Sequence, residues 1–256
     1  MSEHKLRNLL LEGLSVAEAT SFIAAYYPLI KTAPQAGRHG RHVLVFPGFL
    51  TADITTAPLR SVLSGLGYET HGWDLGFNIG PTQELQARME ILLHALHRQH
   101  GKISLVGWSL GGLYARELAR RYPHMVRQVI TLGTPACHAD PAELPPKLVR
   151  MAEHFTAQEF EELHKGFFKT GTANPPVPTT AVVSETDGVV GVSSALIEES
   201  RIHQNVRVYA THIGMGVNPG VLWVLAERLA KPTSRWARFR PPRNFFARFF
   251  PNQKPS

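Results

Sequence analysis

The stretch Lys102-Ile103-Ser104-Leu105-Val106-Gly107-Trp108-Ser109-Leu110-Gly111-Gly112-Leu113 sets a turn of small residues between an apolar segment and a helical one. Residues 103–106 have the β-branched, apolar content of an interior strand, and residues 113–120 have helical spacing. The G-x-S-x-G pattern between them indicates a sharp strand-to-helix turn, where glycines let neighbouring main chain approach closely. Such a turn lifts the Ser109 hydroxyl above the sheet and sets the Leu110 N–H at a helix N-terminus, where negative charge is favoured. The stretch predicts a nucleophilic serine rather than an ordinary Gly/Ser turn.

Strand and helix patterns alternate along the rest of the chain. The sequence predicts strands at residues 42–46, 68–74, 103–106, 126–132, 180–184 and 206–210, and helices at residues 58–66, 82–97, 113–120 and 219–230. This alternation predicts an α/β fold with a mostly parallel central sheet and helices on both faces. In such sheets the functional groups collect beyond the carboxyl ends of the strands.

Around this pattern, the length of 256 residues favours one large domain with additions. Residues 1–36 predict an N-terminal helical segment, residues 37–230 the core, and residues 231–256 a C-terminal tail. Within the core, residues 137–178 have proline-rich borders and two amphipathic stretches. We expect this part to form a small helical cap insertion over one end of the sheet, covering the site that holds an acyl group.

The charge of the chain is uneven. The formal net charge is +7, and residues 231–256 carry two Lys and five Arg without Asp or Glu, so the other 20 basic residues balance the 20 acidic ones. Basic residues interleaved with Trp and Phe suit an anionic bilayer surface, so peripheral membrane contact is one expectation for the tail. A partly packed or disordered end is the other. Nucleic-acid binding is not expected, because the rest of the chain is balanced in charge.

Cysteine content and hydropathy indicate the cellular compartment of the protein. A single cysteine, Cys137, cannot form an intramolecular disulfide, and no stretch has the length and apolar character of a signal h-region or a membrane span. We therefore expect a cytoplasmic protein.

Histidines recur at intervals of three residues at His94, His97 and His100. Zinc clusters usually bring a second group of ligands from another segment, and no cysteine or acidic motif accompanies these three. The pattern favours a solvated helix face, and we expect neither a metal nor a cofactor in this protein.

Three predicted strands end close to Ser109, Asp187 and His212, in that chain order. A serine hydroxyl becomes a good nucleophile when a histidine takes its proton, and a buried carboxylate fixes the histidine tautomer. Glu185 is the alternative acid and His203 the alternative base. The loop after residues 42–46 makes Phe49 the first candidate for a second main-chain donor to an oxyanion, beside Leu110.

From about Val43 to Ala230 the sequence resembles the α/β-hydrolase superfamily, specifically bacterial carboxylesterases and lipases. The resemblance rests on four motifs, which are Phe46-Pro47-Gly48-Phe49, Gly107-Trp108-Ser109-Leu110-Gly111-Gly112, Asp187-Gly188-Val189-Val190 and Thr211-His212-Ile213-Gly214. It implies Ser109 as nucleophile, Asp187 as acid and His212 as base, with Leu110 and Phe49 as oxyanion donors. Pro47-Gly48 departs from the His-Gly of many relatives.

The expected reaction is hydrolysis of an apolar acyl or aryl ester, from a small-molecule or lipid-like substrate, through an acyl-enzyme and without a cofactor. A thioesterase or an acyltransferase would use the same triad, and a hydrolase fold that only binds ligands is a further alternative. Apolar residues in the predicted loops and cap are the candidates for substrate binding, with core packing as their alternative role: Phe49, Leu50, Trp108, Met215, Phe160 and Phe167.

Overall fold

The computed structural model describes residues 20–37, 41–135 and 173–251. Its strands are β1 (His42–Phe46), β2 (Glu69–Gly72), β3 (Ile103–Trp108), β4 (Val126–Leu132), β5 (Thr179–Ser184) and β6 (His203–Val208). Its helices are α2 (Asp53–Gly65), α3 (Gln83–His100), α4 (Leu110–Arg121), α7 (Val192–Ala195) and α8 (Pro219–Ala230). The 3-10 helices are η2 (Ile213–Gly216), η3 (Thr233–Arg235) and η4 (Phe245–Phe249).

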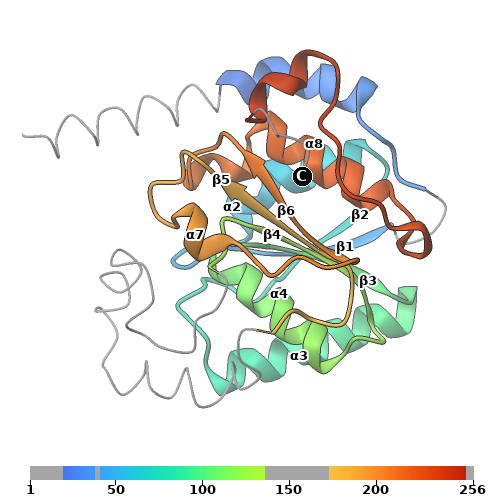
Figure 1. The fold of residues 1–256 in the computed structure, drawn as a ribbon. Helices are drawn as coiled ribbons and strands as arrows, with labels where there is room; N and C mark the ends of the chain where they lie inside the picture. Colours follow the sequence, from blue (N-terminus) through green and yellow to red (C-terminus); the bar gives the residue numbers. More distant parts are fainter. Residues whose placement is uncertain (1–19, 38–40, 136–172, 252–256) are drawn as a thin grey trace, which may run out of the picture.

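The six strands form one sheet in the order β2-β1-β3-β4-β5-β6, and every neighbouring pair is parallel. Figure 1 shows α2 and α8 on one face of this sheet and α3 and α4 on the other. The prediction of a parallel α/β sheet with helices on both faces is confirmed. Because all strands are parallel, the loops that follow β1, β3, β5 and β6 share one edge of the sheet, as active-site loops do in such folds.

Alternation along β1 explains the two-sided core. Val43 and Val45 point into the cluster that contains α2 and α8, whereas Leu44 and Phe46 point into the cluster with α3 and α4. Successive side chains on a strand face opposite ways, so a strand buried on both faces is apolar throughout. The burial of both faces holds the strand ends at fixed positions relative to one another.

The helix predicted at residues 58–66 is longer in the structure. α2 begins at Asp53, and Pro58 lies inside it. The β-branched residues of the first turn conceal this start, because they lower helix propensity. In the structure, Thr56 Oγ1 and Arg60 Nη2 both donate to the Asp53 carbonyl, at 3.0 Å each, and so satisfy main chain in the turn before the proline.

The N-terminal segment and the cap are described only in part. Residues 20–32 are helical, and Ala25, Leu29 and Ala33 pack against the cluster formed with α2 and α8. The predicted cap insertion at residues 137–178 lies almost wholly outside the described residues. Within the described ranges, no helix combines the length and the apolar character needed to cross a bilayer.

The described part of the C-terminal tail packs against the core. η4 contacts α8, and the rings of Phe239, Phe246 and Phe250 are buried. Phe239 N donates to Gln204 Oε1 at 2.8 Å, and Tyr209 N donates to Phe249 O at 2.9 Å. These contacts fit the packed alternative for most of the aromatic side chains. Membrane contact stays a prediction, for which the exposed basic and aromatic residues of the described tail are Arg238, Arg240, Arg243, Phe245 and Arg248.

Because η4 is part of the core, we expect Phe246→Ala to lower the free energy of unfolding by about 3–5 kcal/mol. Phe246 is 2% exposed, and its ring centroid lies 4.9 Å from that of Trp223. Phe245→Ala is the matched control, since that ring is 54% exposed and contacts the Arg248 guanidinium. It should cost less than about 1 kcal/mol. Urea unfolding of both variants measures the difference, and equal effects would contradict a packed tail.

Candidate functional site

Ser109 occupies a strained turn between β3 and α4. Its φ of +52° lies in the left-handed region, which costs a non-glycine residue roughly 1–3 kcal/mol. Glycines make the turn possible because a Cβ on Gly111 would lie 2.5 Å from the Phe46 carbonyl oxygen, and one on Gly107 would overlap the Gly111 main chain. The G-x-S-x-G pattern therefore reflects close approach of three pieces of main chain around one serine, which is 5% exposed.

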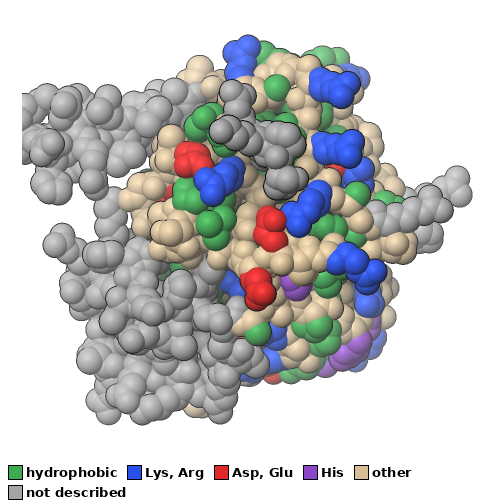
Figure 2. Space-filling model, in the orientation of Figure 1, with side chains coloured by type: hydrophobic (Ala, Val, Ile, Leu, Met, Phe, Trp, Pro, Cys, Tyr) green, Lys and Arg blue, Asp and Glu red, His purple; other side chains and the backbone are tan. Residues whose placement is uncertain are grey.

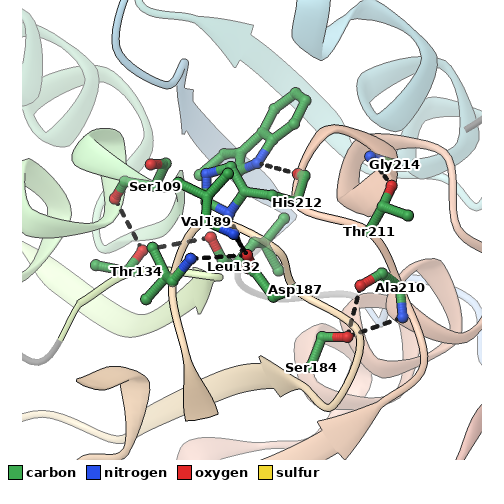
Figure 3. Close-up of polar contacts among 12 residues, drawn as sticks. Ser109, Leu132, Thr134, Ser184, Asp187, Val189, Ala210, Thr211, His212 and Gly214 are labelled. Atoms are coloured by element: carbon green, nitrogen blue, oxygen red, sulfur yellow. Dashed lines mark hydrogen bonds and ion pairs between the residues drawn. The ribbon is translucent and has the colours of Figure 1, made fainter. Parts of the chain in front are cut away.

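Hydrogen bonds to the end of β4 hold this turn in place. Ser109 N donates to the Leu132 carbonyl at 2.8 Å, and Thr134 Oγ1 donates to the Ser109 carbonyl at 2.9 Å. Figure 3 shows Thr134 between these two carbonyls, with the Ser109 side chain free of these bonds. The main chain is thus fixed while the hydroxyl stays available.

Asp187 and His212 form a hydrogen-bonded pair beside this turn. His212 Nδ1 lies 2.8 Å from Asp187 Oδ2, and the Asp187 side chain is almost fully buried. The other oxygen, Asp187 Oδ1, accepts from the N–H groups of Val189 and Val190 at 2.8 Å each. A carboxylate held at both oxygens can fix the orientation and the tautomer of an imidazole.

The loop that carries His212 is fastened on both sides of the histidine. Trp108 Nε1 donates to the His212 carbonyl at 3.0 Å, which ties this loop to the residue before Ser109. Ser184 Oγ donates to Ala210 O at 2.6 Å and accepts from Ala210 N at 2.9 Å, joining the ends of β5 and β6 (Figure 3). Among the residues described, the Ser109 hydroxyl makes no hydrogen bond to the His212 ring. In enzymes without substrate such a catalytic hydrogen bond is often long or poorly aligned, and it tightens when substrate binds.

Two main-chain segments flank the serine as candidate oxyanion donors. Leu110 is the first residue of α4, so its N–H has no partner within the helix. The loop 47–50, which carries Phe49, lies against the turn, because a Cβ on Gly48 would be 3.5 Å from Ser109 Cβ. Main-chain N–H groups beside a nucleophile are the donors that an oxyanion requires, so Leu110 and Phe49 stay the candidates.

A buried asparagine, Asn78, holds the Phe49 loop. Asn78 Nδ2 donates to Pro47 O at 3.0 Å, and Tyr114 Oη donates to Asn78 Oδ1 at 3.1 Å. The Asn78 main chain also hydrogen-bonds to this loop. Leu50 N donates to Asn78 O at 2.7 Å, and Asn78 N donates to Thr51 O at 2.8 Å. Asn78 was not predicted as a site residue, and no local pattern marks it, because its role depends on a contact with Pro47, 31 residues earlier in the chain.

The alternative acid and base have other partners. Glu185 is exposed and forms an ion pair with Arg207 at 2.6 Å. His203 lies at the first residue of β6, where its Nε2 is 3.0 Å from the Pro175 carbonyl and its Nδ1 is 3.0 Å from Ser200 Oγ. In the described part of the chain neither side chain hydrogen-bonds to Asp187 or His212, so the geometry favours the pair Asp187 and His212.

The candidate substrate-binding residues differ in exposure. Phe49 and Trp108 are half-buried and Leu50 is 47% exposed, whereas Met215 is fully buried in the cluster with α8. Phe160 and Phe167 lie outside the described residues. The structure adds three exposed apolar side chains that sequence patterns did not single out: Phe77 and Ile79, which flank Asn78, and Ile213, which follows His212. We call these three residues and Leu50 the apolar rim.

Comparison with known proteins points to one fold. A family model described as the alpha/beta hydrolase fold matches residues 63–174. The structure resembles a lipase-esterase related protein from Clostridium acetobutylicum, with a TM-score of 0.54 and 14% identity over 77% of this chain and 98% of that one. It also resembles the lipase BlEst2 from Bacillus licheniformis, with a TM-score of 0.55 and 14% identity over 78% of this chain and 96% of that one.

A sequence relative is the pimeloyl-[acyl-carrier protein] methyl ester esterase of Shewanella woodyi, which is 31% identical over 100 residues. The match covers 38% of this chain and 38% of the relative, so it spans less than half of either protein. A protein of the same name from another Shewanella strain is 30% identical over 120 residues, or 44% of each chain.

Proposed function

Given that the chain has the α/β-hydrolase fold, we propose that it is a serine ester hydrolase in which Ser109, His212 and Asp187 form the catalytic triad. The observation that carries the proposal is the Asp187 carboxylate, held by two main-chain N–H groups and bonded to His212 Nδ1 at 2.8 Å. That arrangement leaves His212 Nε2 as the lone-pair nitrogen, the form that can accept a serine proton.

In the proposed reaction, Ser109 Oγ attacks the ester carbonyl carbon while His212 Nε2 takes the hydroxyl proton. The carbonyl oxygen becomes an oxyanion, which accepts hydrogen bonds from the main-chain N–H groups of Leu110 and Phe49. Collapse of this intermediate breaks the ester C–O bond, and the alcohol leaves with the proton from His212. Water then attacks the acyl-serine by the same route, with His212 as base, and releases the acid and free Ser109.

The apolar rim supports an apolar acyl or aryl ester as substrate. Leu50, Phe77 and Ile79 belong to the two loops that hydrogen-bond to each other through Asn78, and Ile213 directly follows His212. An acyl chain bound across exposed apolar side chains removes apolar surface from water, at about 25 cal/mol per Å². A charged peptide would gain nothing from this surface.

A second candidate substrate is the methyl ester of an acyl chain carried by an acyl-carrier protein. The relatives from Shewanella are named for such a methyl ester, and their likeness covers 38% and 44% of this chain. A thioesterase or acyltransferase reaction would use the same side chains, because the acceptor is chosen by water access and pocket shape.

Hydrolysis of p-nitrophenyl esters from acetate to decanoate tests the proposal. We expect turnover to rise from acetate toward medium chains, and a fluorophosphonate probe should label Ser109. The methyl ester of pimeloyl-carrier protein and the matching pimeloyl thioester, assayed side by side, separate the second candidate from a thioesterase. A folded protein that hydrolyses none of these esters and does not react with the probe would overturn the proposal.

We further expect Asn78→Ala to lower kcat by about 10²-fold with a smaller change in KM, because a displaced Phe49 loop misplaces one oxyanion donor. Asn205→Ala is the matched control. Its side chain also fastens a loop through one main-chain residue, accepting from Ile197 N at 2.9 Å and donating to Ile197 O at 2.8 Å. It should lower stability without the loss in kcat, and equal kcat losses in both variants would contradict the positioning role of Asn78.

A further inference from the structure

Three histidines from separate elements meet on the sheet face that α3 covers. His42 is the first residue of β1, His71 lies in β2, and His100 is the last residue of α3. In the β1–β2 register Leu44 pairs with His71, and residues two apart on a strand share a face, so His42 and His71 point the same way. The end of α3 adds the third ring.

The ring nitrogens are close enough to share one ion. His42 Nδ1 lies 3.2 Å from His71 Nε2, and one nitrogen from each of the three rings lies within 4.8 Å of the others. Two nitrogens bound to a tetrahedral zinc at about 2.0–2.1 Å stand roughly 3.3 Å apart, so the first pair already has the separation of two ligands. The His100 ring stacks on the His42 ring with centroids 3.8 Å apart. His100 is exposed at a helix end, so its side chain can rotate to turn a nitrogen toward the other two.

Burial and neighbouring charges act on the two inner rings of the cluster. Burial lowers the pKa of His42 and of His71, His100 lowers both further, and His42 also lowers that of His71. The Glu69 carboxylate acts on both rings in the opposite sense, because a negative charge beside the cluster favours any cation, whereas Arg41 opposes it at His42.

We propose that His42, His71 and His100 bind one Zn²⁺, with the fourth position open to water. Imidazole is a preferred ligand for zinc, and three imidazoles from β1, β2 and α3 would tie these elements together. Figure 2 shows histidine side chains at the lower right of the molecule. His42 is the first residue of β1, so the cluster lies at the amino end of that strand. Ser109 follows the carboxyl end of β3, so the zinc would act on stability and not on the ester reaction.

This cluster differs from the histidine pattern in the sequence. His94 is exposed with its ring against Tyr122, and His97 has its ring near that of His124. Only His100 of the three joins the cluster, and its partners precede it by 58 and 29 positions. The second group of ligands that a zinc site requires is thus present in the fold, although it is not adjacent in the sequence.

Calorimetric titration with Zn²⁺ tests the proposal, on full-length protein prepared without a polyhistidine tag and freed of metal by a chelator. We expect one ion per chain, with affinity lowered by at least roughly 10- to 100-fold in His71→Ala and in His100→Ala. His94→Ala, on the same helix, is the control and should bind as the unmodified protein does. Because His100 is exposed, its variant keeps the test valid if His71→Ala fails to fold.

Two further readouts separate this site from loose surface binding. Zn²⁺ should raise the melting temperature of the unmodified protein and of His94→Ala, but not of His100→Ala. Co²⁺ in place of Zn²⁺ should give the visible absorption of a four-coordinate site, and chelation should leave ester hydrolysis unchanged. Absence of Zn²⁺ binding, or equal affinity in His100→Ala and the unmodified protein, would overturn the proposal.

Discussion

Ser109→Ala is expected to lower kcat/KM for a p-nitrophenyl ester by about 10⁴-fold or more, with the fold intact. The hydroxyl is the proposed nucleophile, and none of the hydrogen bonds that fix the turn uses it, since these run through the Ser109 main chain. The substitution therefore removes the reacting oxygen and none of the hydrogen bonds that fix the turn. Steady-state kinetics measure the loss, and urea unfolding should show stability within about 0.5 kcal/mol of the original.

Two companion variants sharpen this expectation. His212→Ala alone and the double variant with Ser109→Ala should each lose about as much activity as Ser109→Ala, because groups that act as a unit are not additive. Ser109→Gly should also be inactive but no less stable, because relief of roughly 1–3 kcal/mol of strain at the φ of +52° offsets the roughly 0.4–1 kcal/mol that a glycine costs through the unfolded state. Near-normal activity in Ser109→Ala would contradict the mechanism, and additive losses would argue that the two residues act separately.

The sheet could be predicted from the sequence because its strands are apolar throughout and alternate with helical patterns. A buried parallel strand has this composition, and β1 shows why, with Val43 and Leu44 packing into different clusters. The start of α2 could not be predicted, because its stability comes from side-chain bonds to the Asp53 carbonyl rather than from helix propensity. At the start of α2, side-chain contacts in the folded protein therefore outweigh the local helix propensity.

The candidate site shows the same division. Ser109, Asp187 and His212 each follow the end of a strand, so the order of strands and helices in the sequence predicts that their loops share one edge of the sheet. Asn78 has no such signal, since its partners Pro47 and Tyr114 are distant in the chain. The cluster of His42, His71 and His100 could not be predicted for the same reason, because two of its members lie on strands far from the helix that carries the third.

The C-terminal tail illustrates an ambiguity of composition. Arginines interleaved with aromatic residues suit a bilayer surface or a packed end equally well in sequence. In the structure Arg228 of α8 donates to the Ala237 carbonyl at 2.6 Å, and its guanidinium lies 5.5 Å from the Trp236 ring centroid. Composition could not reveal these contacts, because a buried arginine in a neighbouring helix supplies the partner.

Asp187→Asn is expected to lower kcat/KM by about 10⁴-fold, although it changes only one atom of the side chain. Asp187 Oδ1 accepts two main-chain N–H groups, from Val189 and Val190, so the amide oxygen of asparagine must take that position. The amide NH₂ then faces His212 Nδ1 and donates to it. This forces the histidine into the tautomer with the proton on Nε2, which cannot accept the proton of Ser109.

Glu185→Gln is the matched control, since Glu185 follows the same strand but pairs with Arg207 on the surface. We expect its activity within twofold of the original, as for most exposed charges. Nitrogen NMR of His212 should report a proton on Nδ1 in the unmodified protein and on Nε2 in Asp187→Asn, at similar melting temperatures. If Asp187→Asn stays within tenfold of the original activity while Glu185→Gln loses it, Glu185 is the acid. If neither variant loses activity, no carboxylate of this loop orients His212, and the triad proposed from the geometry is wrong.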